Sequence, residues 1–326
     1  MGKIGKCMAV CCSAIGFLFS GAGHGQSTYP NKAVMVQVGL QAGTGSDIAV
    51  RGMLDKVAAA LGQLFVIENL PGAAGFVAAQ KVLRAAPDGY QLVALNSGTV
   101  AVLPHIDSSI RFDPLKELVP IAIITTIPSV LFVHPSVPAK SVGEFIEYAR
   151  KNPGKLTYAS GGIGSVQHLA MEAFMATASL NLLHIPYKGS GQATLDLVAG
   201  RVDSAFQGVV QVIQHAKTNR VRLLAWSGAQ RYPLFPDLPT MQESGVTGYL
   251  YEPWTALFGP AGTPKEVVAK INAEVRKAAR QPELRERWAA QGLEPKDLSV
   301  EQAEAMVRDE FARNGRIIRM HNIKAE

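Results

Sequence analysis

The sequence predicts an α/β protein of two lobes, each a mostly parallel sheet flanked by helices. Short runs of Val, Ile and Leu alternate with stretches whose apolar residues recur at helical spacing, and this alternation occurs in two successive series. The 31 glycines and 19 prolines suit many short connections between such elements. With 326 residues, 48% of them apolar and 18% charged, the chain is long enough to fill two cores.

The first residues have the pattern of a secretory signal. Lys3 and Lys6 precede an apolar stretch, residues 7–19, and small residues follow it. A helix needs roughly 20 apolar residues to span a bilayer, so a retained anchor is the weaker interpretation. We therefore expect residues 1–25 to be a signal peptide that is removed on export.

All three cysteines, Cys7, Cys11 and Cys12, fall inside this segment. A mature chain without them excludes disulfides, thiolate catalysis and thiolate-bound metals. Lipid attachment at Cys11 or Cys12 is an alternative, although the residues before them lack the order expected of a lipoprotein signal. The net charge of +6 is spread along the chain, which argues against a nucleic-acid partner.

The first series of elements alternates strand and helix between residues 34 and 95. Strands are expected at 34–38, 64–67 and 91–95, and helices from Asp47 to Leu61 and at 73–85. Short loops and strands rich in Val, Ile and Leu imply parallel pairing with right-handed crossovers. The nucleotide-binding fingerprint GxGxxG is incomplete after the first strand.

Two apolar strands, 118–126 and 130–133, stand where we expect the chain to leave one sheet and enter another. The second series then has expected helices at 142–150, 165–178, 193–199 and 210–217, and strands at 156–159, 182–185, 202–206 and 223–227. A proline-rich loop at 231–240, a strand at 255–258 and helices at 264–279, 282–291 and 300–313 complete the chain. We assign residues 26–126 and 227–326 to lobe 1 and 127–226 to lobe 2, with a ligand cleft between them.

The glycine-rich segment from Gly39 to Asp47 joins the first strand to the first helix. Unpaired N–H groups at a helix N-terminus, aided by the helix dipole, can hold an anion without an arginine. A carboxylate is the obvious candidate. The alternative is structural: the glycines make the turn, and Ser46 or Asp47 caps the helix.

A second loop of this kind, Ser160 to Ser165, precedes the helix that carries His168. Its glycines allow the backbone to approach a ligand closely, and Ser160 and Ser165 add hydroxyl groups. Two such loops on two lobes can hold the two ends of one small anion. The alternative is a tight turn followed by a Ser165 cap.

Enzymatic and metal-binding interpretations find little support. Ser165 and His168 lie three residues apart, but there is no GxSxG motif and no carboxylate placed to orient the histidine. His168 and Glu172 can share a helix face as two metal ligands, yet no third ligand accompanies them. A histidine satisfied by its neighbours near the hinge or cleft is the better interpretation.

Three residues of the second series are ambiguous. Tyr187 can form a flat wall of the cleft, and Lys188 can pair with an acid or simply face solvent. Asp203 can receive a ligand amine or a backbone donor.

The sequence resembles the substrate-binding receptors of tripartite tricarboxylate transporters, the Bug family, from Tyr29 nearly to its end. The shared words are Leu61-Gly62-Gln63, Glu68-Asn69-Leu70-Pro71-Gly72-Ala73-Ala74-Gly75, Ala86-Pro87-Asp88-Gly89-Tyr90, Gly164-Ser165 to His168-Leu169-Ala170, Pro186-Tyr187-Lys188-Gly189, Gly200-Arg201-Val202-Asp203, Pro236-Asp237-Leu238-Pro239-Thr240 and Pro260-Ala261-Gly262-Thr263-Pro264. Several long sequence motifs in a fixed order are far more specific than any single glycine loop.

The resemblance implies a two-lobed periplasmic binding protein fold (Venus flytrap) that closes on a small carboxylated solute. Such solutes are dicarboxylates, acidic amino acids and aromatic acids. The expected protein is a periplasmic monomer that delivers its solute to the permease subunits of the transporter, without enzyme activity, cofactor or metal. A receptor that docks on a sensor-kinase ectodomain is the alternative.

Carried over position by position, the resemblance implies ligand contacts from both glycine loops and their neighbours. These residues are Thr44, Gly45, Ser46, Asp47, Gly72, Ala73, Gly75, Ser97, Ser160, Gly161, Gly164, Ser165, His168, Tyr187 and Asp203.

Two segments depart from the family pattern. The first loop of the family usually reads Pro-Phe-Pro-Pro-Gly-Gly, whereas this chain has Gly39-Leu40-Gln41-Ala42-Gly43-Thr44. The family's Ser-Trp-Tyr-Gly is Pro253-Trp254-Thr255-Ala256 here. Both changes affect the expected ligand more than the expected fold.

Overall fold

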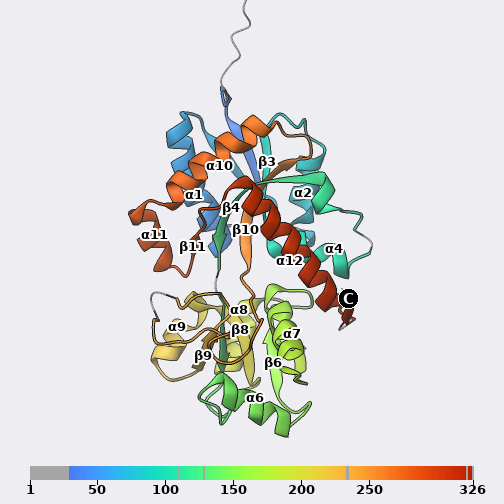
Figure 1. Ribbon diagram of the computed structural model, residues 1–326, viewed down its shortest axis with the longest axis vertical. Coiled ribbons are helices and arrows are strands. Elements are labelled where there is room, and N and C mark those ends of the chain that lie inside the picture. The colour runs from blue at the N-terminus through green and yellow to red at the C-terminus, as the bar shows by residue number, and fades with distance from the viewer. Residues whose placement is uncertain (1–28, 109, 128, 233–234, 321, 325–326) are drawn as a thin grey trace, which may run out of the picture.

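The computed structural model describes residues 29–108, 110–127, 129–232, 235–320 and 322–324. The expected signal peptide and its three cysteines lie outside these residues, so cleavage and lipid attachment stay predictions. Figure 1 shows two lobes along the long axis of the molecule, and each lobe contains one sheet flanked by helices. The predicted two-lobed α/β class is confirmed.

The first sheet has the strand order β11-β4-β10-β3-β1-β2. Its strands are β1 (Val34–Val38), β2 (Phe65–Asn69), β3 (Gln91–Asn96), β4 (Leu118–Thr126), β10 (Trp254–Pro260) and β11 (Glu294–Pro295). Strand β1 pairs in parallel with β2 and β3, whereas β10 runs antiparallel to β3 and β4. The sheet is therefore mixed rather than mostly parallel, because the strand that returns from the second lobe enters it in the opposite direction.

Helices cover both faces of the first sheet. They are α1 (Gly45–Leu61), the 3-10 turn η1 (Ala73–Gly75), α2 (Phe76–Leu83), α3 (Ser97–Ala101), α4 (Leu103–Ile106), α5 (Pro114–Glu117), α10 (Lys265–Ala279) and α11 (Pro282–Ala289). Val50 of α1 and Ile271 of α10 pack in the core on one face, while Ala79 of α2 packs in the core on the other. The sequence did not predict α3, α4 or α5, because helices of four or five residues are too short to show a periodicity.

The second sheet has the strand order β7-β6-β8-β5-β9. Its strands are β5 (Ser129–Val133), β6 (Thr157–Ser160), β7 (Leu183–Pro186), β8 (Ser204–Gly208) and β9 (Arg222–Trp226), and its helices are α6 (Val142–Lys151), α7 (Val166–Ala178), α8 (Ser190–Val198) and α9 (Val209–Lys217). Strand β6 is parallel to β7 and β8, and β5 is antiparallel to β8 and β9. The two crossings between the sheets lie side by side, since the Ile127 N–H donates to the Pro253 carbonyl oxygen at 2.8 Å.

The segment after β9 belongs by its packing to the second lobe. Met241, Tyr249 and Tyr251 share one apolar core with Phe145 and Phe174 of α6 and α7. The sequence predicts that lobe 1 resumes at residue 227, but these side chains are buried against the second sheet before the chain crosses back. The prolines of this segment indicated a loop correctly but carried no information about which lobe it covers.

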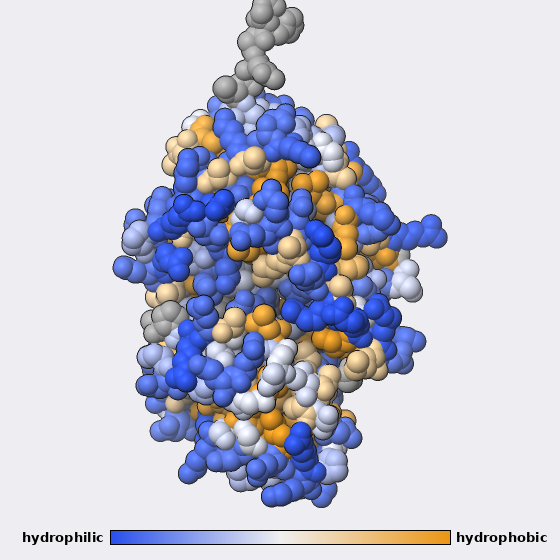
Figure 2. Space-filling model, viewed as in Figure 1, coloured by the Kyte–Doolittle hydropathy of each residue, from blue (hydrophilic) through white to orange (hydrophobic). Residues whose placement is uncertain are grey.

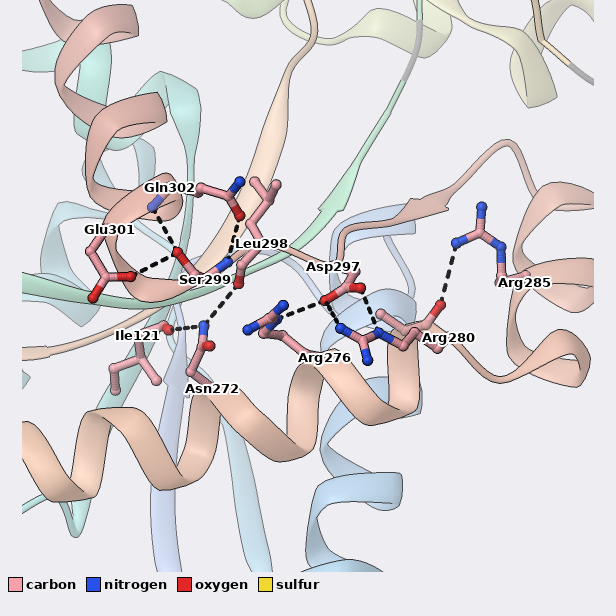
Figure 3. Close-up of polar contacts among 11 residues, drawn as sticks. Ile121, Asn272, Arg276, Arg280, Arg285, Asp297, Leu298, Ser299, Glu301 and Gln302 are labelled. Carbon is pink, nitrogen blue, oxygen red and sulfur yellow. Dashed lines mark hydrogen bonds and ion pairs between the residues drawn. The ribbon is translucent and has the colours of Figure 1, made fainter.

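Polar contacts fix the start of α12 (Val300–Met320) to the first lobe (Figure 3). Asn272 of α10 donates to the carbonyl oxygens of Ile121 and Leu298 at 2.8 and 3.1 Å. Asp297 accepts hydrogen bonds from Arg276 and Arg280 at 2.7 and 2.6 Å. These bonds hold the segment before the helix against α10.

The far end of α12 reaches the second lobe, as Figure 1 shows. Ile318 packs in the same core as Leu169 of α7. The sequence predicts an end near residue 313, because Asn314 and Gly315 are poor helix formers. The helix continues because Gly315 lies against His105, where a Cβ would come within 2.7 Å of the ring, and because the apolar residues beyond it are buried.

The face shown in Figure 2 is mostly hydrophilic, and its hydrophobic groups lie in several small areas spread over both lobes. Among the described residues, no helix combines the length and apolar character needed to cross a membrane.

Candidate functional site: the cleft between the lobes

Two adjoining cavities occupy the space between the lobes. The first chamber, of about 660 Å³, lies between the loops at 39–44, 71–75 and 161–167 and the start of α3. The second chamber, of about 710 Å³, lies between the start of α1, the crossings at Ile127 and Pro253, and the starts of α8 and α9. Both are lined by Leu40, Thr44, Asn96, Val166 and Gln167, so they form one continuous cleft of a size typical for small-molecule sites.

The first loop runs from Gly39 to Thr44 and ends where α1 begins. Thr44 is the N-cap residue, and its hydroxyl oxygen accepts from the Asp47 N–H at 3.3 Å. Asp47 is only 2% exposed and accepts from the Gly43 N–H at 2.9 Å, from Asn69 Nδ2 at 2.8 Å and from Arg51 Nε at 3.1 Å. Asp47 therefore holds the first loop in place from its buried side, while Thr44 and the backbone of this loop face the cleft.

Replacing Asp47 by Asn tests this support. Burial raises the pKa of the Asp47 carboxyl, but the bonds from Asn69, Gly43 and Arg51 outweigh burial and hold the pKa below its ordinary value. A lowered pKa stabilises the folded state above the unfolded pKa, and this contribution disappears as the pH falls through the folded pKa. We expect Asp47→Asn to lower the free energy of unfolding by about 1–2 kcal/mol at pH 7, with the difference closing below pH 4.

Urea titrations across this pH range measure the effect. The control is Asp55→Asn, an exposed position on the same helix, which should leave the free energy of unfolding almost unchanged at both ends of the range. Equal losses in the two variants would show that Asp47 does not support the loop.

The loop at 72–75 approaches the first loop more closely than side chains permit. A Cβ on Gly39 would lie 2.9 Å from the Cα of Gly75, and a Cβ on Gly75 would lie 2.8 Å from Thr99 Oγ1. Thr99 Oγ1 donates to the Ala74 carbonyl oxygen at 2.5 Å and so fixes this loop to α3. Gly75 also has φ +94°, a left-handed conformation that glycine adopts without strain. Glycine is therefore required at both positions for the two loops to meet.

The second loop is held by its own serines and by a histidine. Ser160 is buried, and its Oγ accepts from the Gly162 N–H at 3.1 Å and lies 2.7 Å from His184 Nε2. Ser165 caps α7 by accepting from the His168 N–H at 3.3 Å. The Gly164 N–H donates to His168 Nδ1 at 3.0 Å. Gly161, Gly164 and Ser165 line the first chamber above this framework.

Helices of both lobes begin at the cleft: α1, α2, α3, α4, α7, α8 and α9 have first residues or caps among the lining residues. Caps with side-chain acceptors are present on α1, α3 and α7, whereas Gly189 and Gly208 precede α8 and α9 without such a bond. Within the part of the chain that the structure describes, no lysine or arginine lines either chamber, and Asp107, at the first chamber, is the only charged lining residue. The partial positive charges at the cleft lining are therefore those of helix N-termini and N–H groups.

The structure brings nine of the fifteen predicted residues to the cleft lining. These are Thr44, Gly45, Ser46, Gly72, Ala73, Gly75, Gly161, Gly164 and Ser165.

The other six predicted residues lie behind or beside the lining. Ser97 is fully buried next to Asn96, and Asp47, Ser160 and His168 support the loops as described above. Asp203 accepts from the Thr157 N–H and hydroxyl at 2.7 and 2.8 Å, and the Tyr187 hydroxyl donates to Asp196 at 3.0 Å. Ligand contact stays a prediction for all fifteen.

Sequence reasoning missed the side-chain amides of the cleft. These amides belong to Asn96, Gln167 and Gln207, which line the cleft. Gln167 Nε2 donates to Gln207 Oε1 at 3.1 Å. Gln207 Nε2 donates to the Ser190 carbonyl oxygen, and Gln207 Oε1 accepts from the Gly208 N–H, both at 3.2 Å. Gln207 thus ties α7 to the starts of α8 and α9. Asn96 and Gln207 stand at or next to the last residues of strands whose carboxyl ends border the cleft, and this position was the available signal.

The family model described as the tripartite tricarboxylate transporter family receptor matches residues 49–323. The chain belongs to this family. The predicted Bug-family membership of the receptor is confirmed by BugT of Bordetella pertussis, which is 30% identical over 293 residues, or 90% of each chain. This is a family of substrate-binding receptors and not a class of enzymes.

Two solved structures resemble the receptor closely. Rpa4515 of R. palustris, solved with adipate, has a TM-score of 0.77 and 30% identity over 91% of this chain and 99% of its own. MatC (Rpa3494) of Rhodopseudomonas palustris, solved with bound malate, has a TM-score of 0.73 and 30% identity over 89% of this chain and 100% of its own.

Proposed function

We propose that this protein is a periplasmic receptor that captures a small carboxylated organic solute and delivers it to the permease subunits of a tripartite transporter. The observation that carries the proposal is the cleft itself, where helix N-termini from both lobes converge and no lysine or arginine among the described residues lines the walls. Such a cleft attracts an anion of low charge and holds it through N–H groups and hydroxyls. Adipate and malate in the two similar structures are acids of this kind.

The carboxylate would sit where the two chambers meet. Thr44 and Val166, which line both chambers, stand at the starts of α1 and α7 on opposite lobes. A carboxylate between them receives N–H groups from both lobes, so closure of the lobes strengthens binding. The rest of the solute would extend into the second chamber, whose walls combine apolar side chains such as Ile48 and Val209 with neutral amides.

Thermal unfolding with a panel of acids tests the proposal. The panel contains malate, adipate, aspartate and nicotinate at millimolar concentration, and each acid is paired with its uncharged amide. A ligand at about 100 times its dissociation constant should add about 2.7 kcal/mol to the free energy of unfolding, whereas its amide should add almost nothing. If no carboxylate raises the melting temperature, or if acid and amide act alike, the carboxylate proposal is wrong.

A further inference from the structure

Two imidazole rings and a phenol ring form a stack directly beneath the second loop. The ring centroids of Tyr158 and His184 are 4.7 Å apart, and those of His184 and His168 are 4.1 Å apart, with 11° between the planes in both pairs. His168 is 5% exposed. The stack joins β6, β7 and α7, the elements that flank the loop.

The hydrogen bonds of His168 define which ring nitrogen carries the proton. Because the Gly164 N–H donates to Nδ1 at 3.0 Å, Nδ1 is an acceptor and bears no hydrogen. Nε2 lies 3.5 Å from Glu172 Oε1, the same oxygen that accepts the Tyr158 hydroxyl at 2.6 Å. The arrangement therefore requires the neutral ring with its hydrogen on Nε2, directed toward Glu172.

The bond from Gly164 to His168 joins the cleft-lining part of the second loop to a side chain of α7. Gly164 has φ +72°, and it lines the first chamber together with Gly161 and Ser165. A second proton on His168 would place Nδ1–H against the Gly164 N–H, two donors facing each other. The hydrogen bond would be lost and the loop would move.

The groups that face His168 are Tyr158 from β6, His184 from β7 and Glu172 from α7. Burial, with a smaller effect of His168, lowers the pKa of His184 to about 4. Burial and the neighbouring Glu172 raise the pKa of Tyr158. Tyr158 and His184 therefore stay neutral near pH 7, which leaves Glu172 as the acidic group beside His168 Nε2.

We propose that His168 is a positioning residue that sets the second loop through the Gly164 amide, and that protonation of its Nδ1 releases the loop and weakens solute binding in acid. The part that concerns solute binding rests on the proposed function. The part that concerns the loop rests only on the geometry of the protein without ligand.

Two substitutions distinguish the roles of the two ring nitrogens of His168. In His168→Asn the side-chain oxygen takes the place of Nδ1, so it can accept from Gly164 but cannot be protonated. In His168→Gln the amide takes the place of Nε2, so the acceptor for Gly164 is lost. Circular dichroism and thermal unfolding establish first that both variants fold.

The first measurement uses NMR on the full mature chain without ligand, from pH 8 to pH 5, the range in which histidines commonly change charge. We expect the Gly164 amide resonance to titrate in the native protein, to stay constant in His168→Asn and to be displaced at every pH in His168→Gln. In the native protein at pH 7.5, the side-chain nitrogen signals should report a hydrogen on Nε2. A hydrogen on Nδ1, or a Gly164 titration that His168→Asn retains, would overturn the proposal even if a variant failed to fold.

The second measurement is the affinity for adipate at pH 8 and pH 5.5 by calorimetry. Loss of one hydrogen bond should weaken adipate binding to the native protein about two- to tenfold at the lower pH. This loss is counted beyond the change measured in His168→Asn, because adipate itself also takes up protons in this range and affects both proteins equally. His168→Gln should bind weakly at both values. An equal pH dependence of adipate affinity in the native protein and in His168→Asn would overturn the link between His168 and solute binding. Absence of adipate binding at both pH values would count against the proposed function, and the NMR result would then decide the role of His168 in the loop.

Discussion

Gly75→Ala should weaken solute binding by between ten- and a hundredfold. At φ +94° an alanine costs about 1–2 kcal/mol in backbone strain. Its Cβ would also meet Thr99 Oγ1 at 2.8 Å and the Gly39 carbonyl oxygen at 3.1 Å, and overpacking of this kind costs about 1–3 kcal/mol. The loop relieves both by moving away from the first loop, so the cleft must be rebuilt before a solute is held. Calorimetric titration with the acid that gives the largest thermal shift measures the loss.

Two further variants make this prediction specific. Gly39→Ala inserts a methyl group into the same contact from the other side, 2.9 Å from the Gly75 Cα, so its effect should not add fully to that of Gly75→Ala. Gly143→Ala is the control, since Gly143 is exposed on α6 and the nearest atom, Ser141 Oγ, is 3.9 Å away. The control should keep native affinity. Native affinity in Gly75→Ala would mean that the approach of the two loops does not shape the site.

The free energy of unfolding should fall by about 3 kcal/mol between pH 4.5 and pH 8 because of Glu310 alone. This residue of α12 is 3% exposed, Trp254 Nε1 donates to its Oε2, and Arg313 Nη2 lies 4.0 Å from the same oxygen. Burial raises the pKa of Glu310 from 4.5 to about 7, and Arg313 and Trp254 oppose the rise without cancelling it. The free-energy difference between these two pKa values is about 3 kcal/mol.

The direction of this pH dependence follows from which state, folded or unfolded, holds the Glu310 proton. Between pH 4.5 and pH 7 the folded state keeps the Glu310 proton and the unfolded state has lost it, so raising the pH favours unfolding. The contribution is complete below the unfolded pKa and is lost as the pH rises through about 7. Glu310→Gln keeps an acceptor for Trp254 and cannot ionise, so the native protein should lose stability relative to this variant as the pH rises.

Chemical unfolding at several pH values gives the difference between native protein and Glu310→Gln. Asp309→Asn removes a carboxylate from an exposed position of the same helix, and this control should follow the native curve. Parallel curves for native protein and Glu310→Gln would show that Glu310 does not ionise in this range.

The predicted loops lie at the cleft because their position follows from strand order. Gly39 follows β1 and Gly161 follows β6, and the carboxyl ends of strands in such sheets meet at a shared edge where ligands bind. Chain position and residue type were sufficient to select these loops. They were not sufficient to tell which side chains line the cleft, since Asp203 is bonded to Thr157, 46 residues away, and lies outside the lining of both chambers.

The sequence alone determined the α/β class, the family, most strands and the two glycine loops, because these depend on local periodicity and on short motifs of consecutive residues. The tertiary structure decided that α12 continues past Gly315 into the second lobe, that the segment from residue 235 to residue 251 covers the second lobe, and that Gln167 and Gln207 join three helix N-termini. Each of these depends on contacts between residues far apart in the chain. Local sequence does not encode the distance or direction of such contacts, which arise only when the elements pack.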